Sequence, residues 1–240
     1  SKAMDSLFTP KSNQRAVLHC GFLYNRSLTA GRCGLGSRMV TTKYECGQMA
    51  TDGSYTSDNA DFLVAAANAF PVSTLVNNSG MILSSIEKWN FAQVIIGTAH
   101  VGGAPVYLYQ YWNGVAWTAL TTFLLDTLNF GSATTQQLLF MAPSDWIAGG
   151  KDDAGNTITK LNGQYAIKVK ATTAPTITAA VLGGGLLGTI QVHRHFPADT
   201  EKSLELSQVP VIVGVGDALT AYWAASDAGN YVMASGYERQ

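Results

Sequence analysis

The chain has 240 residues, of which 47% are hydrophobic and only 13% are charged, and its formal net charge is −1. This composition is too apolar for a disordered protein and lean in charge for a monomer that stays soluble alone, so we expect large surfaces buried against other chains. Abundant Thr, Ala, Gly and Asn, with few Glu, Lys or Arg, argue against a helical protein. The length fits one large β-sandwich or two small domains.

Residues 1–57 are expected to form an extended basic N-terminal arm, in which Ala16–Tyr24 is the one clear strand. The formal charge is +5 over residues 1–46 and −6 over the rest. Such an arm is either a solvated basic face or a segment that docks on an acidic protein or nucleic acid. Nucleic-acid tails are denser in Lys and Arg, so we favour a protein surface. The basic residues of the predicted interface are Lys2, Lys11, Arg15, Arg26, Arg32, Arg38 and Lys43.

No apolar stretch follows a basic start, so no signal peptide is expected. The uncharged run Ala171–Val192 has the length of a membrane span, but it contains Pro175 and four glycines. Two buried strands joined by a Gly-rich turn fit this run better, and no membrane partner is expected. Three cysteines, each followed by glycine, predict free thiols in a chain folded in a reducing cytoplasm.

Asp58–Phe70 is the best helix candidate, since Asp58 or Asn59 can cap it and Pro71 ends it; a strand through Phe62–Ala66 is the alternative. Strands then recur at short spacing, separated by Gly-rich and Asn-rich turns. We expect them at Met81–Ile86, Phe91–Thr98, Val106–Trp112, Val115–Phe123, Gln137–Met141, Gln164–Ala171, Ile177–Leu182, Thr189–Phe196, Val209–Val215, Leu219–Ala224 and Tyr231–Tyr237. This pattern predicts an all-β fold, an antiparallel β-sandwich or jelly roll with at most one or two short helices. Residues 58–198 would form the sandwich, and residues 199–240 would complete it or form a small lobe.

The segment Val106–Trp146 contains the strongest turn signal, because Asn113-Gly114 separates two runs of aromatic and β-branched residues. A two-residue turn would place Trp112 opposite Val115 and Gln110 opposite Trp117. Side chains alternate along a strand, so the tryptophan face is expected to be the core. The opposite face would carry a row of tyrosines that packs under a loop of the same chain, meets a protein or stacks on a sugar. These tyrosines are Tyr107, Tyr109 and Tyr111.

Motifs that carry chemistry are weak. Gly183–Gly188 matches a dinucleotide-binding pattern, but a strand rather than a helix is expected to follow it. His193 and His195 lack the later histidine of a metal-binding jelly roll, and Asp152–Asn156 lacks the spacing of a calcium loop. No nucleophile elbow, catalytic triad base or carboxylate pair stands out. We therefore expect a protein that is not an enzyme, with no cofactor and no metal site.

Several of these segments together resemble a known module. The succession comprises Tyr111–Leu120 (YWNGVAWTAL), then Asp126–Phe130, then Ala142–Trp146 (APSDW), then Gly163–Lys170 (GQYAIKVK). It is similar to a β-sandwich module of structural proteins of tailed-bacteriophage virions, found among tail, baseplate and head-surface components. The chain departs from that module at Asp126-Thr127, where Asp-Gly-Thr is usual, and at Ala166, where an aromatic residue is common.

The resemblance implies a virion structural protein. The short chain, the basic arm and the low charge favour the head over the tail, and the expected role is a capsid decoration (cement) protein. Its expected partners are the major capsid protein and further copies of itself, arranged as trimers, on the capsid surface of particles assembled in the host cytoplasm. Nucleic acid is disfavoured as a partner. The alternative is a tail-fibre, baseplate or receptor-binding module that engages a host glycan.

Overall fold

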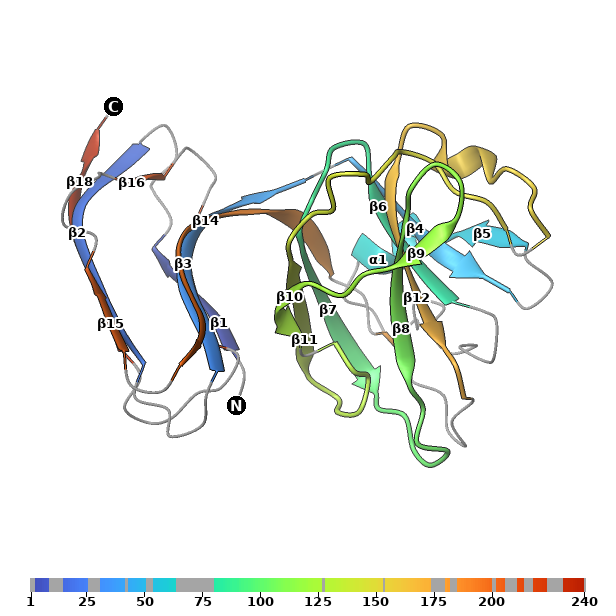
Figure 1. Ribbon diagram of the computed structural model, residues 1–240, viewed down its shortest axis with the longest axis horizontal. Coiled ribbons are helices and arrows are strands. Elements are labelled where there is room, and N and C mark those ends of the chain that lie inside the picture. Colours follow the sequence, from blue (N-terminus) through green and yellow to red (C-terminus); the bar gives the residue numbers. More distant parts are fainter. Residues whose placement is uncertain are drawn as a thin grey trace. The chain divides into compact units, whose positions relative to one another are not determined.

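A computed structural model describes residues 3–8, 15–25, 31–41, 43–50, 54–63, 80–126, 128–152, 154–173, 180–181, 185–199, 202–205, 211–213, 218–223 and 231–239 (Figure 1). The chain divides into two compact units. Unit 1 comprises residues 1–40, 124–126 and 189–240, and unit 2 comprises residues 41–123 and 127–188. Unit 2 is therefore inserted into a unit that both ends of the chain build.

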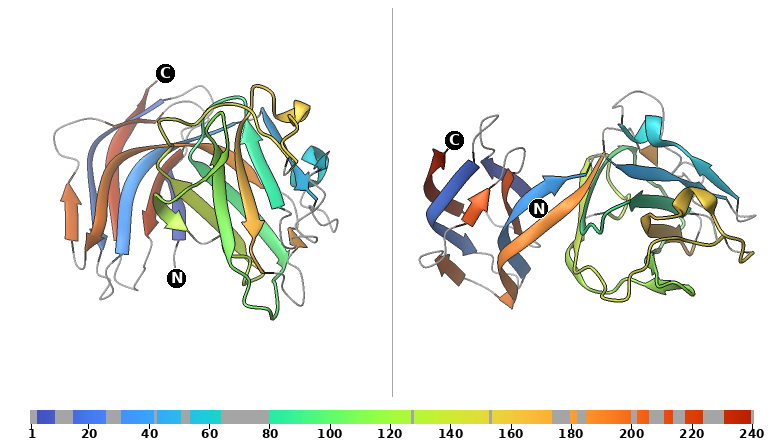
Figure 2. Two further views of the ribbon diagram at one scale, coloured as in Figure 1. Left: turned by 45° about the vertical axis from the view of Figure 1, so that its right-hand side comes forward. Right: turned by 90° about the horizontal axis from the view of Figure 1, so that it is seen from above.

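Unit 2 is a sandwich of two antiparallel sheets. The first has the order β5-β4-β6-β12-β8-β9. Its strands are β4 (Tyr44–Met49), β5 (Tyr55–Ser57), β6 (Gly80–Ser85), β8 (Tyr107–Trp112), β9 (Trp117–Ala119) and β12 (Tyr165–Ala171). In the second sheet, β7 (Phe91–Thr98) pairs with β11 (Thr135–Phe140), β13 (Ala180–Val181) and the first residues of β14 (Leu186–Asp199). Strand β10 (Phe123–Asp126) begins in this unit. Figure 2 shows β6, β12 and β8, which are distant in sequence, side by side.

The main core lies between these two sheets. Alternate residues of each strand point inward, as the period of a β-strand requires. From the first sheet come residues such as Leu83, Tyr109 and Ile167, and from the second come Val94 and Leu138. All are at most 8% exposed. The prediction of an all-β sandwich is confirmed.

A second, smaller core covers the outer face of the first sheet. The segment 147–164, which contains the 3-10 helix η2 (Thr159–Leu161), folds over this face. Its Ile158 and Leu161 pack with Ile82 and Ala166 of the strands below. We call this group, with Met49, the outer cluster. Both faces of β12 are therefore buried, and the strand reads as a nearly continuous buried run.

Unit 1 pairs strands from the two ends of the chain. Its strands are β1 (Ala3–Phe8), β2 (Arg15–Asn25), β3 (Gly31–Val40), β15 (Lys202–Glu205), β16 (Val211–Val213), β17 (Ala218–Trp223), β18 (Tyr231–Arg239) and most of β14. Strand β17 lies between β1 and β3, and β2 pairs with β15, β16 and β18. The pairings of β17 with β1 and β3, and of β2 with β15, β16 and β18, are antiparallel.

The arm expected over residues 1–57 differs from the structure, which places five strands there. β1, β2 and β3 hydrogen-bond to C-terminal strands, while β4 and β5 belong to the sandwich. The sequence of this region has little alternation, and the partners that order it lie about 200 residues away, so local patterns did not reveal it. The boundary at residue 58 also differs from the observed one after Val40, and residues 189–240 group with unit 1. In the expected helix, α1 spans Asn59–Leu63, and residues 64–70 lie outside the described residues.

Candidate interface

The hairpin between β8 and β9 has a four-residue loop, Asn113–Ala116, rather than the predicted two-residue turn. Trp112 pairs with Trp117, and Gln110 pairs with Ala119. The Asn113 side chain explains the longer loop, because its Oδ1 accepts hydrogen bonds from the backbone N–H groups of Val115 (2.9 Å) and Ala116 (2.8 Å). Within this loop only Gly114 has a positive φ, +94°, whereas a type I′ turn needs a positive φ at both central residues.

The predicted hairpin core is observed only in part: Trp112 is 6% exposed and Trp117 packs on the outer cluster, but it is the tyrosine face that points into the main core. Tyr109 and Tyr111 are each 8% exposed and belong to the main core, and Tyr107 packs against it. Tyr109 contacts Phe123 edge-on, with 5.4 Å between ring centroids. Leu108 on the other face is 41% exposed. The register error of two residues preserves which side chains share a face, so only the direction of the core was misjudged. Tyr109 and Tyr111 are therefore core residues, whereas Tyr107 is only partly buried.

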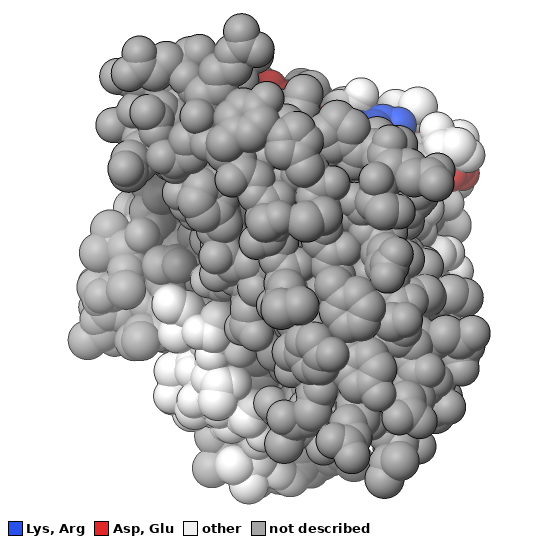
Figure 3. All heavy atoms as spheres, turned by 90° about the vertical axis from the view of Figure 1, so that its left-hand side faces the viewer, with Lys and Arg blue, Asp and Glu red and all other residues white. Residues whose placement is uncertain are grey.

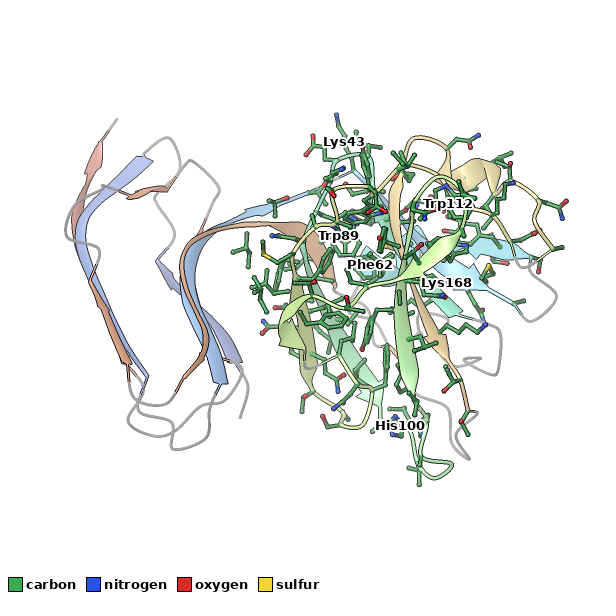
Figure 4. The ribbon with its side chains drawn as sticks, in the orientation of Figure 1. Lys43, Phe62, Trp89, His100, Trp112 and Lys168 are labelled. Atoms are coloured by element: carbon green, nitrogen blue, oxygen red, sulfur yellow. The ribbon has the colours of Figure 1, made fainter. Side chains whose placement is uncertain are left out.

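Segment 147–164 covers Trp112 and Trp117 of the tryptophan face, whereas Val106, Leu108 and Val115 on the same face are 41–82% exposed. Trp117 packs on the outer cluster and donates a hydrogen bond from Nε1 to the carbonyl of Lys151 (2.7 Å). Gly150 allows this close approach, since a Cβ there would lie 2.9 Å from the Trp117 ring. The ammonium of Lys168, a residue only 3% exposed, lies 5.0 Å from the centroid of the same ring. Figure 4 shows Trp112 and Lys168 on this sheet. A cation over an indole in a desolvated place is a stabilising contact.

The corner Pro143–Trp146 inserts Trp146 into the main core. Trp146 is 1% exposed and packs against Trp89, Phe140 and Tyr165, with ring centroids 5.7–5.8 Å apart. Its Nε1 donates to the carbonyl of Ala166 (3.2 Å), and Trp89 Nε1 donates to the carbonyl of Tyr165 (2.9 Å). Each indole N–H thus has a partner on β12, which is the condition for burying a tryptophan without loss. Figure 4 shows Trp89 in the interior of unit 2.

Asp145 connects this corner to the hairpin. The Tyr111 hydroxyl donates to Asp145 Oδ1 at 3.0 Å and lies 3.3 Å from Oδ2. Burial and this hydrogen bond to a carboxylate raise the pKa of Tyr111 above its usual value. The hairpin, the corner and β12 are therefore one packed assembly.

Tyr107 lies at the end of the sandwich beside His100, which Figure 4 labels there. The Tyr107 hydroxyl and His100 Nδ1 are 3.1 Å apart, and the Tyr107 ring lies 4.7 Å from that of Phe130. Burial raises the pKa of Tyr107 to about 12.

This raised pKa predicts a loss of stability in alkali. An unfolded tyrosine releases its proton near pH 10, whereas folded Tyr107 keeps it until about pH 12. Between these values the folded state binds more protons, so the free energy of unfolding falls as pH rises. Urea unfolding from about pH 9 to about pH 12 measures this slope. Tyr107→Phe should make the slope shallower, leaving the contribution of the other buried tyrosines. An unchanged slope in this variant would show that Tyr107 titrates normally.

A buried carboxylate holds α1 and β5 against β4. Glu45 is 8% exposed and accepts hydrogen bonds from the Tyr55 hydroxyl (2.8 Å) and Asn59 Nδ2 (2.7 Å). Burial and the neighbouring Glu45 raise the pKa of Tyr55, so its hydroxyl stays a donor. Cys46 next to it is fully buried, and burial raises the pKa of its thiol. A buried thiol that is hard to ionise is unreactive.

The seven basic residues of the predicted interface are not gathered by the structure into one described patch. Lys2, Lys11 and Arg26 lie outside the described residues. Arg15 begins β2 opposite Arg239, and Arg38 pairs in register with Ala218. Arg32 lies near the start of β3, and Lys43 is exposed just before β4. On the face in Figure 3, the described side chains are mostly uncharged.

The weaker motifs show no chemistry in the described residues. Asp152 accepts hydrogen bonds from the backbone and side chain of Asn156 (2.8 and 3.0 Å), which lowers the pKa of its carboxyl. That carboxylate therefore caps a turn. Among the residues described, no three His, Cys, Asp or Glu side chains come together as metal ligands. His193 and His195 lie on β14, and residues 183–184 of the Gly-rich run lie outside the described residues. In the described part of the chain, no helix is long and apolar enough to cross a membrane.

The sequence alone does not indicate the outer cluster, the buried Glu45 or the Tyr111–Asp145 hydrogen bond. Lys168 alternates with Ile167 and Val169, a pattern typical of a strand with one exposed face. The covering segment 147–164 has no periodic pattern of its own, so the burial of Lys168 could not be read from spacing. Asp145 lies in the segment Ala142–Trp146 that carries the resemblance, but its hydrogen bond to Tyr111 could not be inferred because the tyrosine face was expected to point away from the core.

No family model matches the chain, and searches of curated proteins and of solved structures found no match.

Proposed function

We propose that this chain is a structural protein of a tailed-bacteriophage virion, and specifically a capsid decoration protein that binds the outer surface of the major capsid lattice. One observation carries the proposal. The segments that resemble the phage module, Tyr111–Leu120, Ala142–Trp146 and Gly163–Lys170, are separated in sequence but pack as one assembly in unit 2. Because the three segments pack around one core, they support the resemblance to a folded module better than segments scattered over the chain would.

The two units suggest how such a protein works. Residues 1–46 have a formal charge of +5, whereas the rest of the chain has −6. Residues 1–40 of this basic region belong to unit 1. Unit 1 would bind the acidic capsid surface, and unit 2 would be carried with it. Weak contacts repeated over many copies give strong overall attachment. A protein that binds only the assembled shell stabilises that shell by mass action.

Cosedimentation of the full chain with genome-free capsids tests this proposal. Deleting residues 1–46 would remove β1, β2 and β3, which pair with C-terminal strands, so charge-neutralising substitutions are the better probe. We expect Lys2→Gln, Lys11→Gln and Arg26→Gln together, all in unit 1, to weaken binding, and added salt to weaken it further.

The matched control replaces three exposed lysines of unit 2, Lys88, Lys151 and Lys160, by Gln. It removes the same charge and should leave binding unchanged. If unmodified protein does not sediment with capsids, the decoration role is wrong. Equal weakening by both variants would mean that net charge, rather than the N-terminal region, drives binding.

A further inference from the structure

The sequence contains two Asn-Gly pairs, Asn113-Gly114 and Asn162-Gly163, and both lie among the described residues. Asparagine is one of the thermolabile residues of proteins. Its side-chain amide can be attacked by the backbone nitrogen of the next residue, and glycine leaves this attack unhindered because it has no side chain. The attack is intramolecular, so its rate depends on how freely the asparagine can reach the required geometry. The two pairs differ in this freedom.

The Asn113 side chain is held in place. Its Oδ1 accepts hydrogen bonds from the backbone N–H groups of Val115 and Ala116, and its own backbone N–H donates to the carbonyl of Ala116 (3.2 Å). Asn113 is also only partly exposed. The side chain has to give up its two hydrogen bonds before it can turn freely toward the nitrogen of Gly114. The loop that Asn113 caps therefore protects it.

The Asn162 side chain lies in a turn that does not hold it. Asn162 has φ −60° and ψ 123°, and Gly163 has φ +75°. The N–H of Gln164 donates to the carbonyl of Leu161 (2.9 Å), so residues 161–164 form a type II turn. Asn162 and Gly163 are both exposed. Within the described part of the chain, no residue forms a hydrogen bond with the Asn162 side chain or with the N–H of Gly163.

We propose that Asn162-Gly163 is a site of spontaneous modification of the main chain. The Gly163 nitrogen gives up its proton and bonds to Asn162 Cγ, the bond from Cγ to Nδ2 breaks, and Nδ2 takes up a proton and leaves as ammonia. Water then opens the resulting succinimide ring at either carbonyl carbon. One opening gives aspartate. The other gives isoaspartate, in which the main chain runs through the former side chain.

The isoaspartate form adds one main-chain atom to a turn on which the outer cluster depends. Leu161, before the turn, is fully buried in that cluster. Gln164, after it, accepts the N–H of Gly149 (2.7 Å), which joins the two ends of segment 147–164. The added atom changes the separation of Leu161 and Gln164. We therefore expect it to loosen this segment and to expose Lys168, which is 3% exposed in the unmodified chain.

Peptide mapping of the full chain after prolonged incubation at neutral pH tests the site. Mass spectrometry detects the exchange of each amide for a carboxyl group, and an isoaspartyl methyltransferase detects the isoaspartate. In the folded protein, Asn113 should react roughly thirty-fold more slowly than Asn162, the factor expected for two hydrogen bonds that must open first. In urea, where the fold is lost, the two pairs should react at similar rates.

The variant Asn162→Gln is the control for the chemistry, because the equivalent attack on glutamine closes a larger ring. It should keep its amide under the same conditions. Equal rates at the two pairs in the folded protein, faster reaction at Asn113, or no loss of ammonia at Asn162 would each overturn the proposal.

Acylation of lysines tests the structural consequence. In aged protein purified for its isoaspartate content, Lys168 should be acylated faster than in fresh protein, whereas the exposed Lys160 should react equally in both. Asn162→Asp is the matched control, since it adds the same charge without lengthening the main chain, and it should leave Lys168 protected. Protection of Lys168 in the isoaspartate form, or equal exposure in Asn162→Asp, would overturn the consequence. None of these measurements involves capsids, so the proposed function stands or falls separately.

Discussion

Replacing Trp146 by Ala should lower the free energy of unfolding by about 4 kcal/mol, the range typical of a buried tryptophan removed from a core. Trp146 contacts three aromatic rings and donates to β12, so its loss opens a cavity between the two sheets. The change is a large fraction of the stability of an ordinary domain. Urea unfolding followed by circular dichroism measures it.

The neighbouring residue supplies the control for this substitution. Ile147 is half exposed, so Ile147→Ala should cost less than about 1 kcal/mol. The two substitutions lie at adjacent positions: one removes a buried side chain and the other removes a half-exposed one. Equal effects would contradict the placement of the Pro143–Trp146 corner in the core.

Tyr109→Ala should also be strongly destabilising, by about 3 kcal/mol, because this side chain is buried in the main core against Phe123. The adjacent Leu108→Ala should cost less than about 1 kcal/mol, since Leu108 points to the other face and is 41% exposed. Chemical denaturation of both variants decides which face of β8 is the core.

The reverse order of these two effects would restore the arrangement that the hairpin pattern suggested, with the tyrosines outside. In that case a tyrosine surface would again be available to a partner. With the order we expect, Tyr109 and Tyr111 act in folding. Binding then depends on other surfaces.

Strand positions were largely predictable, because each strand carries its own alternation and turn residues. Phe91–Thr98 was predicted at its observed bounds, and β8, β11 and β12 within a few residues. The predicted strand Val115–Phe123 is instead split into β9 and the start of β10. The Asn113 side chain caps the loop in a way that the Asn-Gly rule does not include.

The face of a strand that becomes the core was not predictable in the same way. β8 alternates tyrosines with Leu108, Gln110 and Trp112, and both sets can be buried. The choice depends on what covers each face. The second sheet covers the tyrosines, and segment 147–164 covers Trp112 and Trp117. Both covers come from parts of the chain far from the hairpin.

The candidate interface was less predictable than the fold. Basic residues were identified by counting, but counting does not reveal that β1, β2 and β3 pair with C-terminal strands. Val115 was expected in the core and is 82% exposed.

Quantitative mass spectrometry of purified virions tests whether this chain is a capsid decoration protein. For a decoration protein we expect a copy number comparable with that of the major capsid protein. Absence from the particle, or only the few copies typical of a tail component, would contradict it.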